Sequence, residues 1–252
     1  NMTELEELGL LKMDFLGLRT LTVIRDAEAA IQKKDPSFSI RKLDYDDAAT
    51  YKMLGQGETE GVFQLESSGM KQVLVGLQPQ NLEDVIALIS LYRPGPMDSI
   101  PTYLRNRHEP DKISYKTPQL AHILDVTNGC IVYQEQVMQI FRELAGFSFG
   151  QADNVRRAMS KKKHAVMEAE REHFVHGCTE PGHECPGCVA NGISEEVANE
   201  IYDEMSSFAS YAFNKSHAAC YAYVAFQTAY LKCHYPSEFM AALLTSVLDN
   251  TD

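Results

Sequence analysis

The chain has 252 residues, 44% of them hydrophobic, which is enough to bury one large core or two small ones. Its 35 acidic and 23 basic residues give a net charge of −12, which argues against a protein that coats nucleic acid over its whole surface. No apolar run approaches the roughly 20 residues of a membrane span, and the first residues do not read as a secretory leader. We therefore expect a soluble protein with no membrane partner, in which any phosphate binding is local.

Residues 8–17, LGLLKMDFLG, form a short apolar run with one lysine and one aspartate, which is more typical of a strand than of an amphipathic helix. Apolar residues then recur at nearly helical intervals from Leu18 to Ile31, until Asp35-Pro36 ends the pattern. This order predicts strand, turn and helix, with a domain boundary near residue 35.

The remainder of the chain has mostly helical spacing. Helix starts are predicted after Asn81, Thr117 and Ser194, where residue types that favour N-terminal capping precede the apolar pattern. Gly146 predicts a helix end, and Arg93-Pro94-Gly95-Pro96 predicts a rigid loop. Further helices are expected over 216–233 and from Pro236. The sequence thus predicts a mainly α chain with a small α+β portion at the start.

Residues 176–192 break this periodicity with a cluster of Gly, Pro, Cys and His, which predicts a surface loop or a small knuckle between two helices. Cys178, Cys185 and Cys188, with His183 or His176, offer enough sulfur and nitrogen for a tetrahedral zinc site. Only the pair Cys185 and Cys188 has a familiar zinc-knuckle spacing, so unligated cysteines are the alternative. The other three cysteines are scattered singly, as in a reduced core.

Asp14 is a carboxylate in an apolar run, which is costly to bury unless it is paired or binds a metal ion. In a strand Lys12 would lie on the same face as Asp14, an arrangement that suits either a metal-and-phosphate site or a plain salt bridge. The residues alone leave both readings open.

The densest cationic run is RRAMSKKKH, residues 156–164. On a helix Arg157 and Lys161 share a face, and adjacent guanidinium groups suit the oxygens of a triphosphate or of a nucleic-acid backbone. A solvated helix face is the alternative. A second candidate segment, FASYAFNKSHAACY over residues 208–221, combines aromatic rings with Asn214, Ser216 and His217 at the start of a helix, where backbone N–H groups favour an anion.

Five blocks of sequence carry a resemblance that extends over nearly the whole chain. In chain order they are LGLLKMDFLGLRTLTVI, GVFQLESSGMK, DVIALISLYRPGPMDSIP, GCIVYQEQVMQIFRELAGFSFGQADNVRRAMSKKK and SFASYAFNKSHAACYAYVAFQTAYLKCHYPSEFMAALLTSVLDN. They resemble the bacterial family C replicative polymerases, the DnaE-type DNA polymerase III alpha subunits. The resemblance implies that residues 1–35 are the end of a nucleotidyltransferase-type palm, related to polymerase beta, and that residues 36–252 are the helical fingers.

The same resemblance implies site residues. Asp14 would be the third catalytic carboxylate and a magnesium ligand, and Lys12, Arg156 and Arg157 would meet the triphosphate. Further nucleotide-facing residues would be Lys161, Asn214, Ser216, His217, Gln64 and Arg93. The family works by two-metal phosphoryl transfer from a dNTP to a primer 3′-hydroxyl. The expected partners are primer-template DNA, the rest of the polymerase chain in the bacterial cytoplasm and nucleoid, and, through regions beyond these residues, the sliding clamp and the replisome.

In that family the other two carboxylates belong to a Pro-Asp-x-Asp string, which these 252 residues do not contain. We therefore expect the segment alone to have no polymerase activity. The alternative function is a non-catalytic helical nucleic-acid-binding module with a zinc knuckle.

Overall fold

A computed structural model describes residues 4–5, 8–11, 13, 17–160, 164–209 and 213–248. Within these ranges the chain is mainly α, as predicted, and β pairing is limited to two isolated bridges, Tyr133 with Phe213 and Cys178 with Cys185. The strand expected over 8–17 is absent from the described residues of that run, 8–11, 13 and 17; its other residues, Lys12 and Asp14 among them, lie outside the described part.

The described helices follow one another in the chain, with short 3-10 turns between some of them. The α-helices are α2 (Arg19–Gln32), α3 (Ala48–Gly55), α4 (Ser68–Leu77), α5 (Leu82–Leu91), α6 (Ile100–His108), α7 (Ala121–Leu124), α8 (Gln134–Ala145), α9 (Phe149–Ser160), α10 (His164–His176), α11 (Gly187–Ala190), α12 (Glu195–Ala209), α13 (Lys215–His234) and α14 (Pro236–Thr245). The 3-10 turns are η1 (Ile40–Lys42), η2 (Pro96–Ser99), η3 (Pro110–Lys112), η4 (Pro118–Leu120) and η5 (Asp125–Thr127).

Several helix ends follow from the local sequence. Asn81 caps α5, because its side-chain oxygen accepts the Asp84 N–H at 3.0 Å, and Ser194 accepts the Val197 N–H at the start of α12. Gly146 ends α8 with a φ of 74°, a left-handed conformation that glycine adopts without strain. Thr117 differs from the prediction: it precedes η4, and its side chain does not cap the turn.

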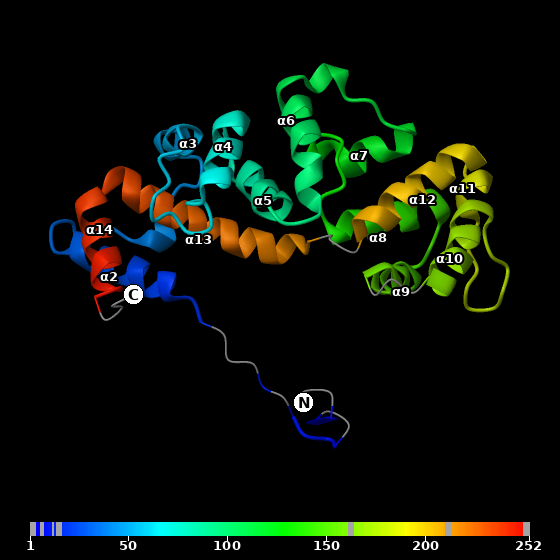
Figure 1. Ribbon diagram of the computed structural model, residues 1–252, viewed down its shortest axis with the longest axis horizontal. Helices are drawn as coiled ribbons and strands as arrows, with labels where there is room; N and C mark the ends of the chain where they lie inside the picture. The colour runs from blue at the N-terminus through cyan, green and yellow to red at the C-terminus, as the bar shows by residue number, and fades with distance from the viewer. Residues whose placement is uncertain are drawn as a thin grey trace.

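Two lobes make up most of the described structure. The first lobe contains α3–α6 packed on α13, with Leu54, Leu88 and Phe226 among its buried residues, and the second lobe contains α7–α12 around Phe141, Phe174 and Tyr202. Figure 1 shows α13 running beneath α3–α5 toward the start of α8, with α9–α12 gathered at the far end. Residues at the start of α13 therefore face the second lobe.

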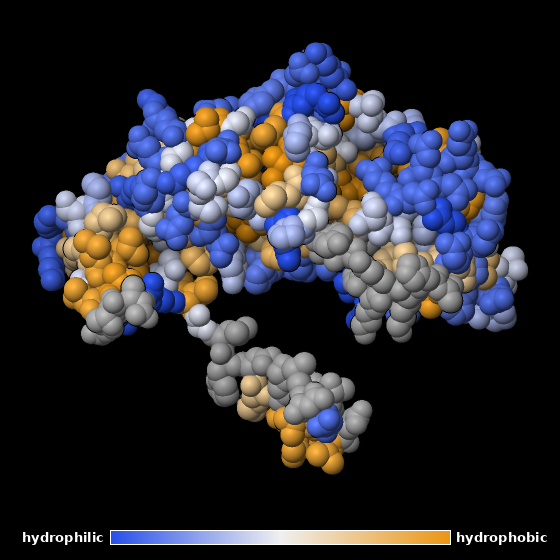
Figure 2. Space-filling model, in the orientation of Figure 1, coloured by the Kyte–Doolittle hydropathy of each residue, from blue (hydrophilic) through white to orange (hydrophobic). Residues whose placement is uncertain are grey.

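A third, smaller cluster joins α2 to the C-terminal helices. Val23, Ile24 and Ile31 of α2 pack with Leu231 and Phe239. Apolar surface gathers at this α2–α14 end of the molecule, where leucines of both elements are exposed (Figure 2). A division near residue 35 stays a prediction, and α2 shares its core with residues on the other side of that boundary.

Candidate nucleotide site

Helix α9 holds the two predicted triphosphate arginines through one carboxylate. Asp153 lies three and four residues before Arg156 and Arg157, which places all three on one side of the helix. Its oxygens accept Arg156 Nη2 at 2.7 Å and Arg157 Nε at 2.8 Å, and hydrogen bonding from Arg156 is the main cause that lowers the pKa of this carboxyl. The Arg156 side chain is 19% exposed and also donates to Gln134 Oε1 at 3.1 Å, whereas the Arg157 side chain is 66% exposed. The Arg157 side chain is thus held by Asp153 through Nε and is largely exposed to solvent.

Helix α13 begins with a side-chain cap. Asn214 is the capping residue, and its Oδ1 accepts the His217 N–H at 2.9 Å. Ser216 is exposed on the first turn. The Lys215 N–H is already bound by both oxygens of Glu135, at 3.1 Å each, and Asn214 Nδ2 donates to the same carboxylate at 2.9 Å. The anion at this helix start is therefore Glu135 of the chain itself.

An aromatic series extends from the start of α13 across the first lobe. The guanidinium of Arg93 lies 4.4 Å from the Phe213 ring centroid, and Phe213 packs edge-on against His217 at 5.2 Å. The His217 ring packs at a tilt against Tyr221, with 4.4 Å between the ring centroids. The Tyr221 ring in turn packs against Phe63, with 5.2 Å between the centroids. The structure thus connects Arg93 to His217 through one ring.

Gln64 follows the last ring of this series. It is exposed, has a φ of 65° and lines a separate cavity of about 580 Å³ beside α2. Of the remaining predicted residues, Lys12, Asp14 and Lys161 lie outside the described part of the chain.

One cavity is lined by residues of both candidate segments. It measures about 480 Å³ and lies along α8, between that helix, α9 and the capping residue of α13. Its lining residues are Gln134, Glu135, Met138, Gln139, Arg142, Glu143, Phe149, Asp153, Arg156 and Asn214. Arg156 and Asn214, which are 58 positions apart in the sequence, therefore face the same space. Phe149 is 65% exposed with Arg142 5.9 Å from its ring centroid, so the cavity offers a flat apolar surface beside its charges.

Comparison with known proteins decides the family. A family model of the bacterial DNA polymerase III alpha subunit finger domain matches residues 20–182. The chain belongs to this family. It is 49% identical over 258 residues to DNA polymerase III subunit alpha of Thermus aquaticus, a match that covers 100% of the chain and 20% of that relative. The subunits of Bacillus subtilis (strain 168) and Staphylococcus aureus (strain COL) are 47% and 46% identical, over 100% and 98% of the chain and 22% of each relative.

The chain therefore spans about a fifth of the length of the curated relatives it matches. The matched range begins within α2 and ends after α10, so it includes Gln64, Arg93, Arg156 and Arg157. These matches confirm the predicted resemblance of the chain to the fingers domain of DNA polymerase III alpha subunits.

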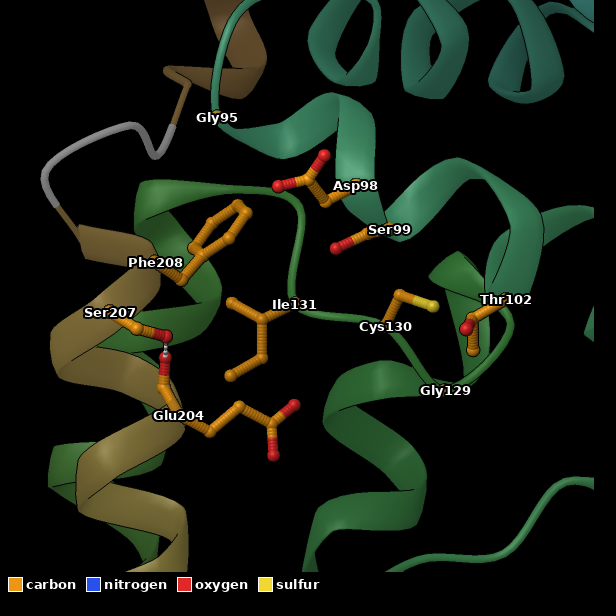
Figure 3. A pocket seen from close by; sticks show the side chains of 10 residues that line it. All are labelled: Gly95, Asp98, Ser99, Thr102, Gly129, Cys130, Ile131, Glu204, Ser207 and Phe208. Atoms are coloured by element: carbon orange, nitrogen blue, oxygen red, sulfur yellow. Dashed lines mark hydrogen bonds between the residues drawn. The ribbon is translucent and has the colours of Figure 1, made fainter.

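Another cavity of the chain has the wrong charge for a phosphate. It measures about 510 Å³ and lies between the end of α12 and the η2–α6 segment, with the loop 129–131 as its floor (Figure 3). Asp98 and Glu204 contribute carboxylates from opposite sides, and no lysine, arginine or histidine is among its described lining residues. Two carboxylates without a facing cation repel a polyphosphate. The cavity at α8, α9 and α13 is the better candidate, because Arg142 and Arg156 line it together with Glu135, Glu143 and Asp153.

The predicted zinc ligands lie in the connection between α10 and α12 but do not form a ligand set. Cys178 and Cys185 pair through two backbone hydrogen bonds of 2.9 Å, and Cys185 and Cys188 are buried in the core of the second lobe. His183 is exposed. In the described ranges no group of three or more His, Cys, Asp or Glu side chains is placed to hold a metal ion. The geometry therefore favours the alternative of unligated thiols.

Thiol labelling tests this assignment. Burial raises the pKa of Cys188 to about 12 and that of Cys130 to about 11, so both thiols are protonated near neutral pH and shielded from reagent, whereas Cys220 is exposed. We expect iodoacetamide to label Cys220 of the native chain rapidly and Cys188 only after unfolding, as measured by peptide mass spectrometry. A chelator should not change these rates. Faster labelling of Cys185 and Cys188 after chelation would show that a metal ion protects these thiols, and would support the zinc site.

The sequence analysis missed Gln134, Glu135 and Asp153. Asp153 had a local signal, since its spacing of three and four from the two arginines is that of helical ion pairs. Glu135 had no sequence signal beyond being an acidic residue in the first turn of a helix, because its hydrogen-bond partners lie 79 and 80 residues away in the chain.

No helix within the described ranges combines the length and apolar character that a membrane span requires.

Proposed function

We propose that the chain supplies the fingers and one catalytic carboxylate of a replicative DNA-directed DNA polymerase, a nucleotidyltransferase that adds dNTPs to a primer 3′-hydroxyl under the direction of a template. The observation that carries this proposal is the cavity of about 480 Å³ that Arg156 and Asn214 share, in a chain of the DNA polymerase III alpha fingers family. A triphosphate placed against this cavity meets the guanidinium of Arg156 on α9 and the side-chain amide of Asn214, the capping residue of α13.

The residues of the fingers would act by binding and orientation. Arg157, exposed and anchored by Asp153, suits the outer oxygens of the triphosphate, and Arg156 suits those nearer the cavity. His217 and the rings of Phe213 and Tyr221 offer a surface on which a base or a sugar can rest. Fixed donors of this kind neutralise charge on the triphosphate and hold it for in-line attack.

The remaining chemistry belongs to the palm. Asp14 would be one of the carboxylates that hold two Mg²⁺ ions; it lies outside the described residues, and the proposal for it comes from the resemblance alone. Bound Mg²⁺ supplies activation of the primer hydroxyl and stabilisation of the pyrophosphate leaving group. Primer-template DNA, dNTPs and the rest of the polymerase chain in the bacterial cytoplasm are the proposed partners, with the clamp and the replisome reached through other regions.

Primer extension tests the proposal. The 252 residues hold only one of the three expected carboxylates, so they should not extend a primer alone, whereas the same residues within a full-length polymerase that contributes the Pro-Asp-x-Asp string should. Loss of DNA binding with rising salt should accompany this activity, because phosphate contacts release counterions. Extension by the isolated segment would place the complete catalytic centre within it, and a full-length chain without activity would remove the polymerase assignment.

A further inference from the structure

Two consecutive residues at the start of α8 connect the cationic helix to the start of α13. Gln134 Oε1 accepts a hydrogen bond from Arg156 Nη1 at 3.1 Å, and the Gln134 N–H donates to the Phe213 carbonyl at 3.0 Å. Glu135 accepts the Lys215 N–H with both oxygens and Asn214 Nδ2 with one. The first turn of α8 therefore contacts both nucleotide-facing segments, each in a different lobe.

From these contacts we propose that Gln134 and Glu135 are positioning residues that set the placement of Arg156 on α9 relative to the Asn214–His217 turn. The inference rests on the proposed function, which makes these two segments the opposite walls of a triphosphate site. Neither residue needs to touch the nucleotide for this role. Each acts through the side chain or the backbone that it binds.

The physical basis of the Glu135 contact is the unsatisfied start of α13. The first N–H groups of a helix have no partner within it, and a carboxylate placed there is stabilised by hydrogen bonding and by the helix dipole. Asn214 satisfies the His217 N–H, and Glu135 satisfies that of Lys215. The Lys215 side chain is held from the other side, since its Nζ lies 3.0 Å from Glu83 Oε2. The turn is thereby fixed to α5 and to α8 at once.

Removal of the Glu135 side chain should loosen this turn without unfolding the lobes. Glu135 is exposed, so its loss opens no cavity, and Asn214 retains its own bond to the His217 N–H. The consequence is that the Asn214–His217 turn shifts relative to Arg156 on α9. A misplaced wall weakens nucleotide binding and alignment more than it weakens the fold.

Single-nucleotide incorporation by the full-length polymerase tests the role. Glu135→Ala should lower kcat/KM for the dNTP by about tenfold, because charge-assisted hydrogen bonds to a fixed turn are lost. Glu135→Gln keeps an acceptor oxygen for the Lys215 N–H and should recover most of that loss. Affinity for primer-template DNA and the melting temperature should change little in both. Glu200→Ala is the matched control, since Glu200 is an exposed glutamate that pairs with Lys116 at 3.1 Å away from the cavity.

Two results would overturn the inference. Glu135→Ala with kcat/KM within twofold of the unaltered enzyme would show that the contact does not position the turn. Glu135→Gln as impaired as Glu135→Ala would show that an acceptor oxygen for the Lys215 N–H does not position the turn. An Arg157→Ala variant assayed in parallel separates the two proposals. If Arg157→Ala lowers kcat/KM for the dNTP while Glu135→Ala does not, only the positioning role fails. If Arg157→Ala leaves kcat/KM unchanged, the triphosphate site itself fails, and the positioning role with it.

Discussion

Replacement of Asp14 by Asn in the full-length polymerase is expected to abolish primer extension while DNA binding stays nearly intact. Asparagine has almost the shape of aspartate but lacks its charge, and hard divalent cations require anionic oxygen ligands. Loss of one carboxylate from a two-metal centre should slow phosphoryl transfer by roughly a thousandfold or more, since the developing charge loses its main stabilisation. Rapid-quench primer extension and a DNA-binding titration of the same variant measure the two effects separately.

A matched replacement guards against a trivial loss of folding. Asp26→Asn changes an exposed aspartate of α2 that pairs with Arg25 at 2.8 Å, and it should leave extension unchanged. Near-normal turnover of the Asp14→Asn enzyme would refute the metal role. A variant that lost DNA binding and extension together would point to damage of the fold.

Removal of the α9 arginines is expected to weaken nucleotide use without abolishing it. Arg156→Ala and Arg157→Ala should each cost about 1.5 to 3 kcal/mol, or roughly 10- to 150-fold in kcat/KM for the dNTP, as expected for charge-assisted contacts. Arg156→Ala should also remove the hydrogen bonds that Gln134 Oε1 and Asp153 Oδ1 accept from its guanidinium, so its effect should be the larger of the two. Lysine at position 157 keeps the charge but loses the planar fork, and should fall between arginine and alanine.

A variant that removes one positive charge far from the cavity is the control for this series. Arg41→Ala removes an equal charge from η1, at an exposed residue that does not line the α8–α9–α13 cavity, and should leave dNTP kinetics unaltered. Equal losses for Arg41→Ala and Arg157→Ala would reduce α9 to a generally attractive surface. Unchanged dNTP kinetics in both arginine variants would make α9 a solvated helix face.

The fold was largely accessible from local signals. Capping residues such as Asn81 and Ser194, the glycine at 146 and the apolar spacing of 216–233 each act within a few residues of the helix end that they specify, so a single sequence is enough to read them. The burial of Cys185 and Cys188 could not be predicted from such local signals. A Cys-rich loop and a core edge share the same residue types, and only the packing of α10 and α12 around the loop distinguishes them.

The candidate site shows the same division between local and long-range information. Arg156 and Arg157 were found because a cationic run stands out in an acidic chain. The anion site at the start of α13 stays a prediction as far as a nucleotide is concerned, and the sequence did not indicate that Glu135 binds the Lys215 N–H there. That contact joins residues 80 positions apart, and no periodicity within either segment encodes it.

Photocrosslinking of the bound nucleotide is the most direct measurement of where the triphosphate lies. A dNTP that carries an azidoanilide on its γ-phosphate would be irradiated with the full-length polymerase on primer-template DNA, and the labelled peptides identified by mass spectrometry. Label on peptides that contain residues 149–160 and 213–217, suppressed by excess unmodified dNTP, is the result that the shared cavity predicts. Label that is equally suppressible but confined to peptides outside these two segments would contradict it.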